Sequence, residues 1–221
     1  MWRTKVAAWA LQRPFSAIPR TVGSRSRGSS AHPRSATVDL VEGLSASQRE
    51  KVIRALRVNH AGEYGAVRIY EGQLAVLGRT SEAKQLADMK QHETEHLRLF
   101  RVLLPEQRVR PSAILPIWDL GGFVLGAGSA MLGKGAAYAV TVAVESVITA
   151  HYDKQLQYMS EDLRLGNEHE LVKAIQKFRD EEQEHHDVAL DKGAKDTALF
   201  SIINTLTRGI CHGAIAVSKR L

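Results

Sequence analysis

The chain has 221 residues, of which 44% are apolar and 24% are charged, and its 30 Lys and Arg residues outnumber its 24 Asp and Glu residues. This length allows one ordinary domain with a buried core, with or without a tail. The single cysteine, Cys211, excludes an intramolecular disulfide and a cysteine-rich zinc site. The fold must therefore be held together by packing and by polar groups other than paired thiols.

The first 38 residues hold seven basic residues, six serines and no Asp or Glu. This composition, with apolar residues for one helix face and no continuous apolar run, is typical of a mitochondrial transit peptide. A basic arm that binds nucleic acid or anionic lipid is the alternative. The rest of the chain has 23 basic against 24 acidic residues, so its charge gives no sign of nucleic-acid binding. We predict a disordered transit peptide at 1–38 that is cleaved, and one domain at 39–221.

From residue 41 onward the apolar residues recur with helical spacing, and no stretch alternates as a strand does. Ser45 or Ser47 caps a first predicted helix, which Gly78 ends. Further helices are predicted at 81–104, 135–162, 168–191 and 196–220. Four long helices around an inserted apolar piece predict an all-α, antiparallel four-helix bundle with one long crossover and an extra C-terminal helix.

The inserted segment 120–133 has no charged residue and contains five glycines. As a helix, its 14 residues would cover about 21 Å, which is less than the roughly 30 Å hydrocarbon core of a bilayer. A longer span would place Lys134 at the centre of the membrane, at a cost of several kcal/mol. We therefore predict a piece that lies in the membrane interface, with an ordinary buried crossover as the alternative.

Two Glu-x-x-His motifs place a carboxylate and an imidazole on the same face of a helix, and two solitary glutamates lie on other helix faces that are also apolar. The six side chains are Glu63, Glu93, His96, Glu145, Glu182 and His185. A buried carboxylate costs several kcal/mol unless a cation or strong hydrogen bonds compensate it. These faces carry no Lys or Arg, and only Lys134 could reach them from the crossover. A metal is therefore the most economical partner.

Four glutamates and two histidines in this order across four helices are the ligand set of a di-iron or di-manganese bundle. Oxygen-rich ligation with one imidazole per metal suits iron or manganese better than zinc. His151 and Tyr152 are either core residues bonded to a carboxylate or groups beside the metals. Tyr64 and Tyr70 are expected to be packing residues. Residues expected either on the outward side of the motifs or beside the metal ligands are His92, Glu95, Glu184 and His186.

Six sequence blocks carry a family resemblance. They are 57–66 (RVNHAGEYGA), 72–80 (GQLAVLGRT), 110–118 (RPSAILPIW), 121–134 (GGFVLGAGSAMLGK), 141–145 (TVAVE) and 178–187 (FRDEEQEHHD). The chain resembles the mitochondrial demethoxyubiquinone hydroxylases of ubiquinone biosynthesis over nearly all of 48–221. The resemblance implies a ferritin-like fold and two iron ions held by the six residues above, with Glu93 and Glu182 as bridging ligands.

The resemblance also implies an activity and its surroundings. It implies hydroxylation of the ring of a polyprenylated demethoxyubiquinone with O2 and NADH-derived electrons, by a peripheral protein on the matrix side of the inner mitochondrial membrane. A lipid-binding accessory protein and a homo-oligomer are possible partners, and Arg54 and Arg220 match expected NADH contacts. Ser146 and Ala216 depart from the family pattern. The alternatives are a ferritin-like iron-handling protein and a non-catalytic lipid-binding scaffold.

Overall fold

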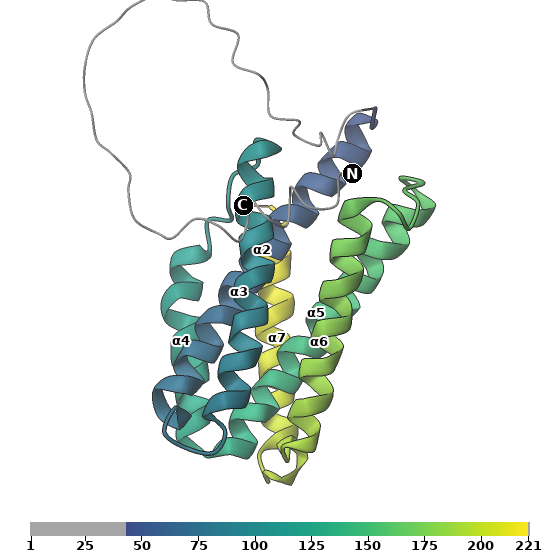
Figure 1. The fold of residues 1–221 in the computed structure, drawn as a ribbon. Coiled ribbons are helices and arrows are strands. Elements are labelled where there is room, and N and C mark those ends of the chain that lie inside the picture. Colours follow the sequence, from purple (N-terminus) through teal and green to yellow (C-terminus); the bar gives the residue numbers. More distant parts are fainter. Residues whose placement is uncertain (1–42, 221) are drawn as a thin grey trace, which may run out of the picture. The chain divides into compact units, whose positions relative to one another are not determined.

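The computed structural model describes residues 43–220, which form α-helices and one short 3-10 helix with no strand (Figure 1). The predicted transit peptide at 1–38 lies outside the described residues. In chain order the elements are α2 (Ala46–Leu77), α3 (Ala83–Glu106), α4 (Leu115–Met131), α5 (Lys134–Glu161), α6 (Glu170–Asp191), η1 (Ala194–Asp196) and α7 (Phe200–Ser218). The predicted all-α class is confirmed.

Helices α2, α3, α5 and α6 form the bundle, and the two remaining long helices lie on its outside. Helix α2 packs against α3 and α4, whereas α5 packs against α6 and α7. In Figure 1, α3 and α6 lie at the front of the bundle and α7 lies behind it. This is the predicted four-helix arrangement, with the crossover and the C-terminal helix as additions, and it is compatible with a ferritin-like bundle.

Two helix ends depart from or refine the sequence predictions. Ser45, and not Ser47, caps α2, because the Ser45 hydroxyl accepts from the Gln48 N–H and the Gln48 side chain accepts from the Ser45 N–H at 2.9 Å. Helix α3 continues past the predicted end at residue 104 and includes Pro105 in its last turn. Proline removes only its own N–H from the helix, so the Gln107 N–H still donates to Leu103 O at 3.0 Å.

The apolar insertion folds as the regular helix α4, which lies on α2 with almost no side chain between the two backbones. A Cβ atom on Gly126 would meet the carbonyl of Ile69 at well under 3.0 Å, and one on Gly72 would meet the carbonyl of Phe123 equally closely. The glycines that weaken an isolated helix are therefore the residues that let α4 dock. The opposite face of α4 is exposed, so the segment is not a fully buried crossover.

Two of the three apolar clusters formed by the described residues lie on either side of a polar layer in the bundle. One cluster includes Leu56, Phe100 and Ile175, and the other includes Leu86 and Met89. The polar layer lies between them along all four helices of the bundle and contains the candidate site. Among residues 43–220, no helix combines the length and the hydropathy that crossing a bilayer requires.

Candidate metal centre

The structure brings the six predicted metal-ligating side chains together in the centre of the bundle, and none of them is more than 3% exposed. Helix α2 contributes one glutamate, α5 contributes another, and α3 and α6 each contribute a Glu-x-x-His motif. The residues are Glu63 from α2, Glu93 and His96 from α3, Glu145 from α5, and Glu182 and His185 from α6. One helical turn separates the two residues of each motif, so both side chains point into the same layer.

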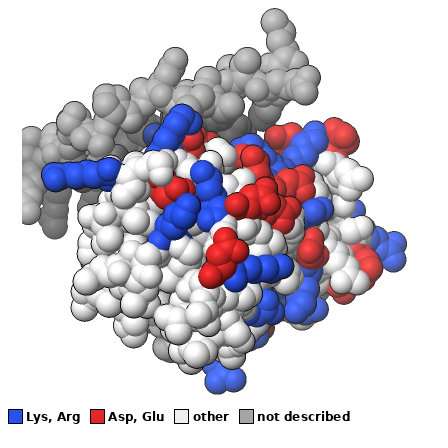
Figure 2. Space-filling view, turned by 90° about the horizontal axis from the view of Figure 1, so that it is seen from below, with Lys and Arg blue, Asp and Glu red and all other residues white. Residues whose placement is uncertain are grey.

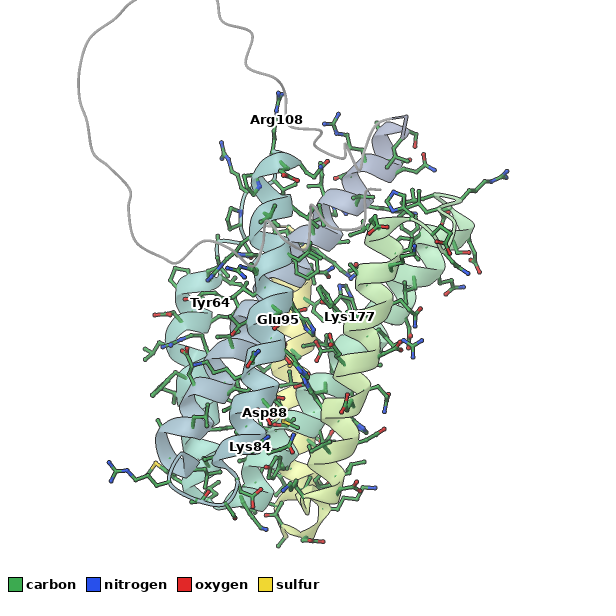
Figure 3. All side chains as sticks on the ribbon, in the orientation of Figure 1. Tyr64, Lys84, Asp88, Glu95, Arg108 and Lys177 are labelled. Atoms are coloured by element: carbon green, nitrogen blue, oxygen red, sulfur yellow. The ribbon has the colours of Figure 1, made fainter. Side chains whose placement is uncertain are left out.

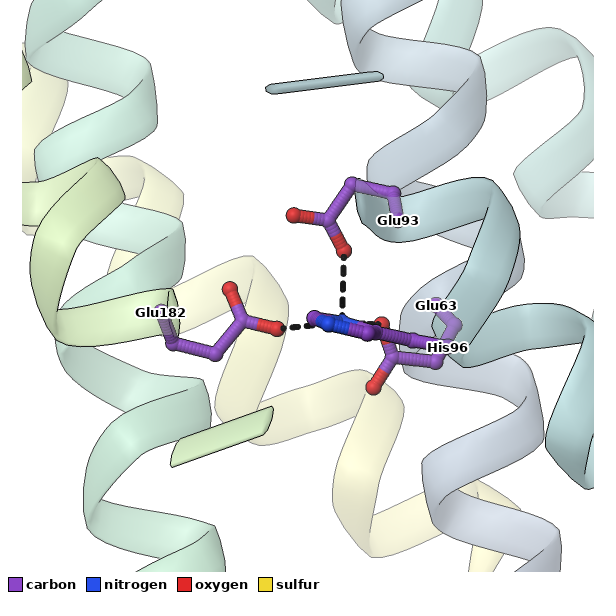
Figure 4. A group of neighbouring side chains, drawn as sticks. All are labelled: Glu63, Glu93, His96 and Glu182. Carbon is purple, nitrogen blue, oxygen red and sulfur yellow. Dashed lines mark ion pairs between the residues drawn. The ribbon is translucent and has the colours of Figure 1, made fainter. Parts of the chain in front are cut away.

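The six side chains form two overlapping groups, each of which could hold a metal ion. The first group is Glu63, Glu93, His96 and Glu182, and the second is Glu93, Glu145, Glu182 and His185. Within each group the candidate ligand atoms lie within 4.8 Å of one another. Figure 4 shows the first group, with the carboxylates directed at the ring of His96. Glu93 and Glu182 belong to both groups, so each could offer oxygens to two neighbouring metal ions.

The contacts among these atoms are close, but they are not hydrogen bonds. His185 Nδ1 lies 3.0 Å from Glu93 Oε1, and His96 Nδ1 lies 3.2 Å from Glu182 Oε1. Buried atoms of the cluster without a hydrogen-bond partner are Glu63 Oε2, both oxygens of Glu93 and of Glu182, Glu145 Oε2, His96 Nδ1 and His185 Nδ1. Buried polar atoms are nearly always hydrogen-bonded in proteins. Carboxylate oxygens and imidazole nitrogens that converge without hydrogen-bond partners fit the role of ligands to two bound cations.

The pKa values of the cluster also fit a site for bound cations. Burial raises the pKa of Glu63 to about 8, and burial followed by the charges of Glu182 and Glu93 raises the pKa of Glu145 well above its usual value. Burial disfavours the charged form of His185 too, but Glu182 and Glu93 outweigh it and raise its pKa to about 10. Without a cation, the buried layer is neutral only if Glu63 and Glu145 hold protons and both imidazoles are protonated, whereas bound cations would let all four carboxylates ionise.

The lysine that might have compensated these carboxylates lies elsewhere. Lys134 Nζ is 3.8 Å from Glu82 Oε1, at the beginning of α5 and three turns of helix before Glu145. Glu82 also accepts a hydrogen bond from Tyr138 and contacts Lys192, so this group ties the end of the bundle together. Lys134 therefore does not compensate the carboxylates of the central layer.

Two tyrosines orient the solitary glutamates. The Tyr152 hydroxyl on α5 donates to Glu63 Oε1 on α2, and the Tyr70 hydroxyl on α2 donates to Glu145 Oε1 on α5 at 2.8 Å. One oxygen of each carboxylate is thus fixed, and the other is left without a hydrogen-bond partner. Tyr152 contacts a carboxylate, as one of the sequence interpretations allowed, whereas Tyr70 is more than the expected packing residue. Its position two turns after Glu63 is the signal that could have identified it.

The second nitrogen of each imidazole also has a partner. His96 Nε2 lies 2.9 Å from Glu181 Oε2, and His185 Nε2 lies 3.1 Å from His92 Nδ1. Glu181 is not among the predicted site residues, whereas His92 was predicted either on the outward side of its motif or beside the ligands, and it lies beside one of them. Both partners immediately precede the glutamate of the other motif, four residues before its histidine, so each lies on the flank of its helix beside the facing helix.

The other flanking residues lie outside the cluster. Glu95 and Glu184 are exposed, as expected, and Figure 3 shows Glu95 on the outer side of α3. Tyr64 donates to Asp119 at 2.6 Å on the surface. The two predicted NADH contacts are not part of the buried layer. Arg54 is exposed and forms an ion pair with Glu50, and Arg220 is exposed after the end of α7.

A mostly apolar pocket reaches the cluster from the side of α4 and α7. It is lined by residues of α2, α4, α5 and α7, among them Glu63, Trp118, Val144, His151, Tyr152 and Cys211. Among residues 43–220, the Nε2 atom of His151 has no hydrogen-bond partner, and burial followed by nearby lysines lowers the pKa of this imidazole to about 4. The pocket thus leads from an apolar wall, past a neutral imidazole, to the carboxylate of Glu63.

The chain is similar to a known protein family and to several named proteins. A family model described as "Ubiquinone biosynthesis protein COQ7" matches residues 50–218. The chain is 42% identical over 221 residues to the human "NADPH-dependent 3-demethoxyubiquinone 3-hydroxylase, mitochondrial". The match covers 100% of this chain and 95% of the relative. It is 44% identical over 170 residues to the "3-demethoxyubiquinol 3-hydroxylase" of Rhodospirillum rubrum, with 76% of this chain and 77% of the relative covered. It is 36% identical over 192 residues to the "5-demethoxyubiquinone hydroxylase, mitochondrial" of Saccharomyces cerevisiae, with 81% of this chain and 82% of the relative covered.

Proposed function

The chain belongs to the COQ7 family of ubiquinone biosynthesis proteins, and on this premise we propose that it is a di-iron monooxygenase that hydroxylates the ring of a polyprenylated demethoxyubiquinone. The observation that carries the proposal is the buried layer of unpartnered carboxylate and imidazole atoms at the end of an apolar pocket. For each turnover, the substrate gains one oxygen atom from O2 in a new ring hydroxyl. The second oxygen atom leaves as water, with two electrons and two protons from the reductant.

In this proposal Glu93 and Glu182 would be ligands of both iron ions, Glu63 and His96 would complete one position, and Glu145 and His185 would complete the other. A bound iron pair supplies the two-electron activation of O2 that ring hydroxylation needs. The protein contributes the fixed positions of the ligands, because Tyr152 and Tyr70 each hold one oxygen of a solitary carboxylate.

The pocket is the proposed binding site of the quinone ring. Its apolar wall suits a flat ring and the first isoprene units, and Glu63, Tyr152 and His151 lie where the ring would meet polar groups. Among the described residues, His151 offers an uncharged nitrogen that has no partner in the protein. We propose that it hydrogen-bonds a ring oxygen and positions the ring beside the metals. An iron store would require the same ligands but would have no use for such a pocket.

The surface around the pocket suits a lipid substrate. Figure 2 shows a broad uncharged area on one side of the molecule, whereas charged side chains gather on the other side. The exposed apolar side chains of α4 and of the residue after it are Ile117, Leu120, Val124, Met131 and Leu132, and those of α7 and of the residue before it include Leu199, Ile202, Leu206 and Ile210. We propose that these two helices lie on the matrix side of the inner mitochondrial membrane, with the isoprenoid tail remaining in the lipid.

The remaining proposals concern electrons, targeting and partners. We propose that NADH supplies the electrons and that Arg54 and Arg220 contact it. The names of several relatives specify NADPH, so both nucleotides belong in the assay. The acid-free leader at 1–38 is the proposed transit peptide, which is in keeping with relatives that are named mitochondrial. A lipid-binding accessory protein and a second copy of this chain are the proposed partners.

The test is to reconstitute the full chain with iron and incubate it with a short-tailed demethoxyubiquinone, NADH or NADPH, and 18O2. We expect a product that carries one additional 18O atom in the ring, detected by mass spectrometry. Glu182→Ala and His96→Ala should abolish hydroxylation while far-UV circular dichroism stays unchanged. Glu184→Ala on the exposed face of the same helix serves as the control. Full turnover by either ligand variant, or a product without the label, would refute the proposal.

A further inference from the structure

The candidate metal centre is built from two halves that nearly repeat each other. In one half a solitary glutamate on α2 is followed seven residues later by Tyr70, and in the other a solitary glutamate on α5 is followed seven residues later by Tyr152. Each tyrosine donates to the glutamate of the other half. The two Glu-x-x-His motifs repeat in the same way. The repeat fails at one point, because the residue before the motif is His92 in α3 and Glu181 in α6.

This single difference changes the partner of each imidazole. Both histidines present Nδ1 to the carboxylates, and both use Nε2 for a residue of the facing helix. His96 Nε2 lies 2.9 Å from a carboxylate oxygen of Glu181, whereas His185 Nε2 lies 3.1 Å from the ring nitrogen of His92. A neutral imidazole that binds a metal through Nδ1 carries its proton on Nε2. Both partners must therefore accept that proton in a hydrogen bond, one through a carboxylate oxygen and the other through a ring nitrogen.

Both partners are held in place by the protein. Glu181 is also contacted by Lys177, whose Nζ lies 3.0 Å from the other carboxylate oxygen. His92 is half-buried, and its ring lies nearly parallel to that of His185, with 5.3 Å between the centroids and 15° between the planes. A carboxylate acceptor makes a ligating imidazole more basic than a neutral acceptor does. The two imidazoles therefore differ as electron donors, although their own positions are equivalent.

We infer that the two positions differ in their affinity for metal. His92 acts as a positioning residue for His185, and the position of Glu145 and His185 is the one with the lower affinity. This inference rests on the proposed di-iron centre. The position of Glu63 and His96, which Glu181 supports, fills first, and the other position fills second. Removal of the partner of a metal-bound histidine typically lowers metal affinity by about 10–100-fold. The loss should fall on one position only, according to which partner is removed.

The test is an anaerobic titration of the metal-free full chain with 57Fe(II). Calorimetry measures the affinity of each binding step, and Mössbauer spectroscopy monitors the ferrous doublets as iron is added. In the unmodified chain we expect two binding steps that differ by about tenfold or more, and one ferrous doublet that appears before the other. His92→Ala should weaken the second step by about 10–100-fold and change the first by less than about threefold. Glu181→Ala should weaken the first step instead.

Two conservative variants separate the acceptor's charge from simple packing. His92→Gln keeps an uncharged acceptor and should restore the affinity of the second step to near that of the unmodified chain. His92→Glu makes the two halves alike and should bring the affinities and the doublets together. Two equal steps in the unmodified chain, or a His92→Ala variant that weakens both steps alike or neither, would overturn the inference. Failure of the unmodified chain to bind iron would also overturn the proposed function, and is distinguished by the absence of any step.

Discussion

The close contact between α4 and α2 predicts opposite effects for the same substitution at two glycines of one helix. Gly126 is buried, and an added methyl group would meet the backbone carbonyl of Ile69, whereas Gly128 is exposed and has nothing within 4 Å of an added methyl. Alanine stabilises an exposed helical position by about 0.5–1 kcal/mol relative to glycine. At Gly126 the same gain is opposed by the overpacking of the added methyl group, which destabilises a well-packed site by about 1–3 kcal/mol. The upper end applies, because a backbone carbonyl moves less readily than a side chain.

Gly128→Ala should therefore raise the free energy of unfolding, and Gly126→Ala should lower it. A difference of about 2–3 kcal/mol between the two variants corresponds to about 5–10 °C in Tm for a domain of this size. Thermal and urea unfolding followed by circular dichroism measure both quantities, with the same detergent present throughout. Equal stability of the two variants would refute the proposed backbone contact and, with it, the explanation of why this segment is rich in glycine.

Three further predictions follow from single contacts. Burial, followed by a nearby arginine, lowers the pKa of His60 from 6.5 to about 4. The free energy of unfolding that this residue contributes above pH 6.5 should therefore be lost as the pH falls toward 4. In urea unfolding, the His60→Gln variant should show a smaller loss over the same pH range. Asn59 and Gln155 form a buried pair of amide hydrogen bonds, so Asn59→Leu should cost about 1–3 kcal/mol in urea unfolding, and the double Leu variant less than the two single losses added together. Val124→Glu should weaken binding to cardiolipin-containing vesicles in a flotation assay, whereas Gln91→Glu on the exposed face of α3 should not.

The inward positions of the six candidate ligands could be predicted because they depend on local spacing. Glu93 and His96 share a helix face through their separation of three residues, and the apolar stripe around them shows that the face is buried. Glu63 and Glu145 stand out because each interrupts such a stripe. The fold class followed from the same periodicity, since helices with one apolar face must pack against one another. None of these steps required knowledge of how far one helix is rotated against the next.

The partners of these residues depend on that rotation and could not be predicted. Glu181 and Glu184 are both acidic residues on α6, yet one contacts His96 and the other is exposed. The difference arises from which flank of α6 faces α3, and this is a property of packing rather than of sequence spacing. The docking of α4 was hidden for a related reason. Glycine suggested a weak helix, and only the neighbouring backbone of α2 shows that the missing side chains make room for a close contact.

The arrangement of the helices separates the two requirements of a lipid-modifying metal site. Helices α3 and α6 bring both Glu-x-x-His motifs and carry much of the charged surface, which lets the protein remain in water on that side. Helices α2 and α5 bring the solitary glutamates and form the wall between the metal layer and the pocket. Among the described residues, the pocket reaches Glu63 from the side of α4 and α7, where the exposed apolar residues lie, so under the proposed function a substrate held in lipid would approach from this side. Because the pocket wall includes Tyr152, which holds Glu63, any change of that wall should affect ring binding and the position of a metal ligand together.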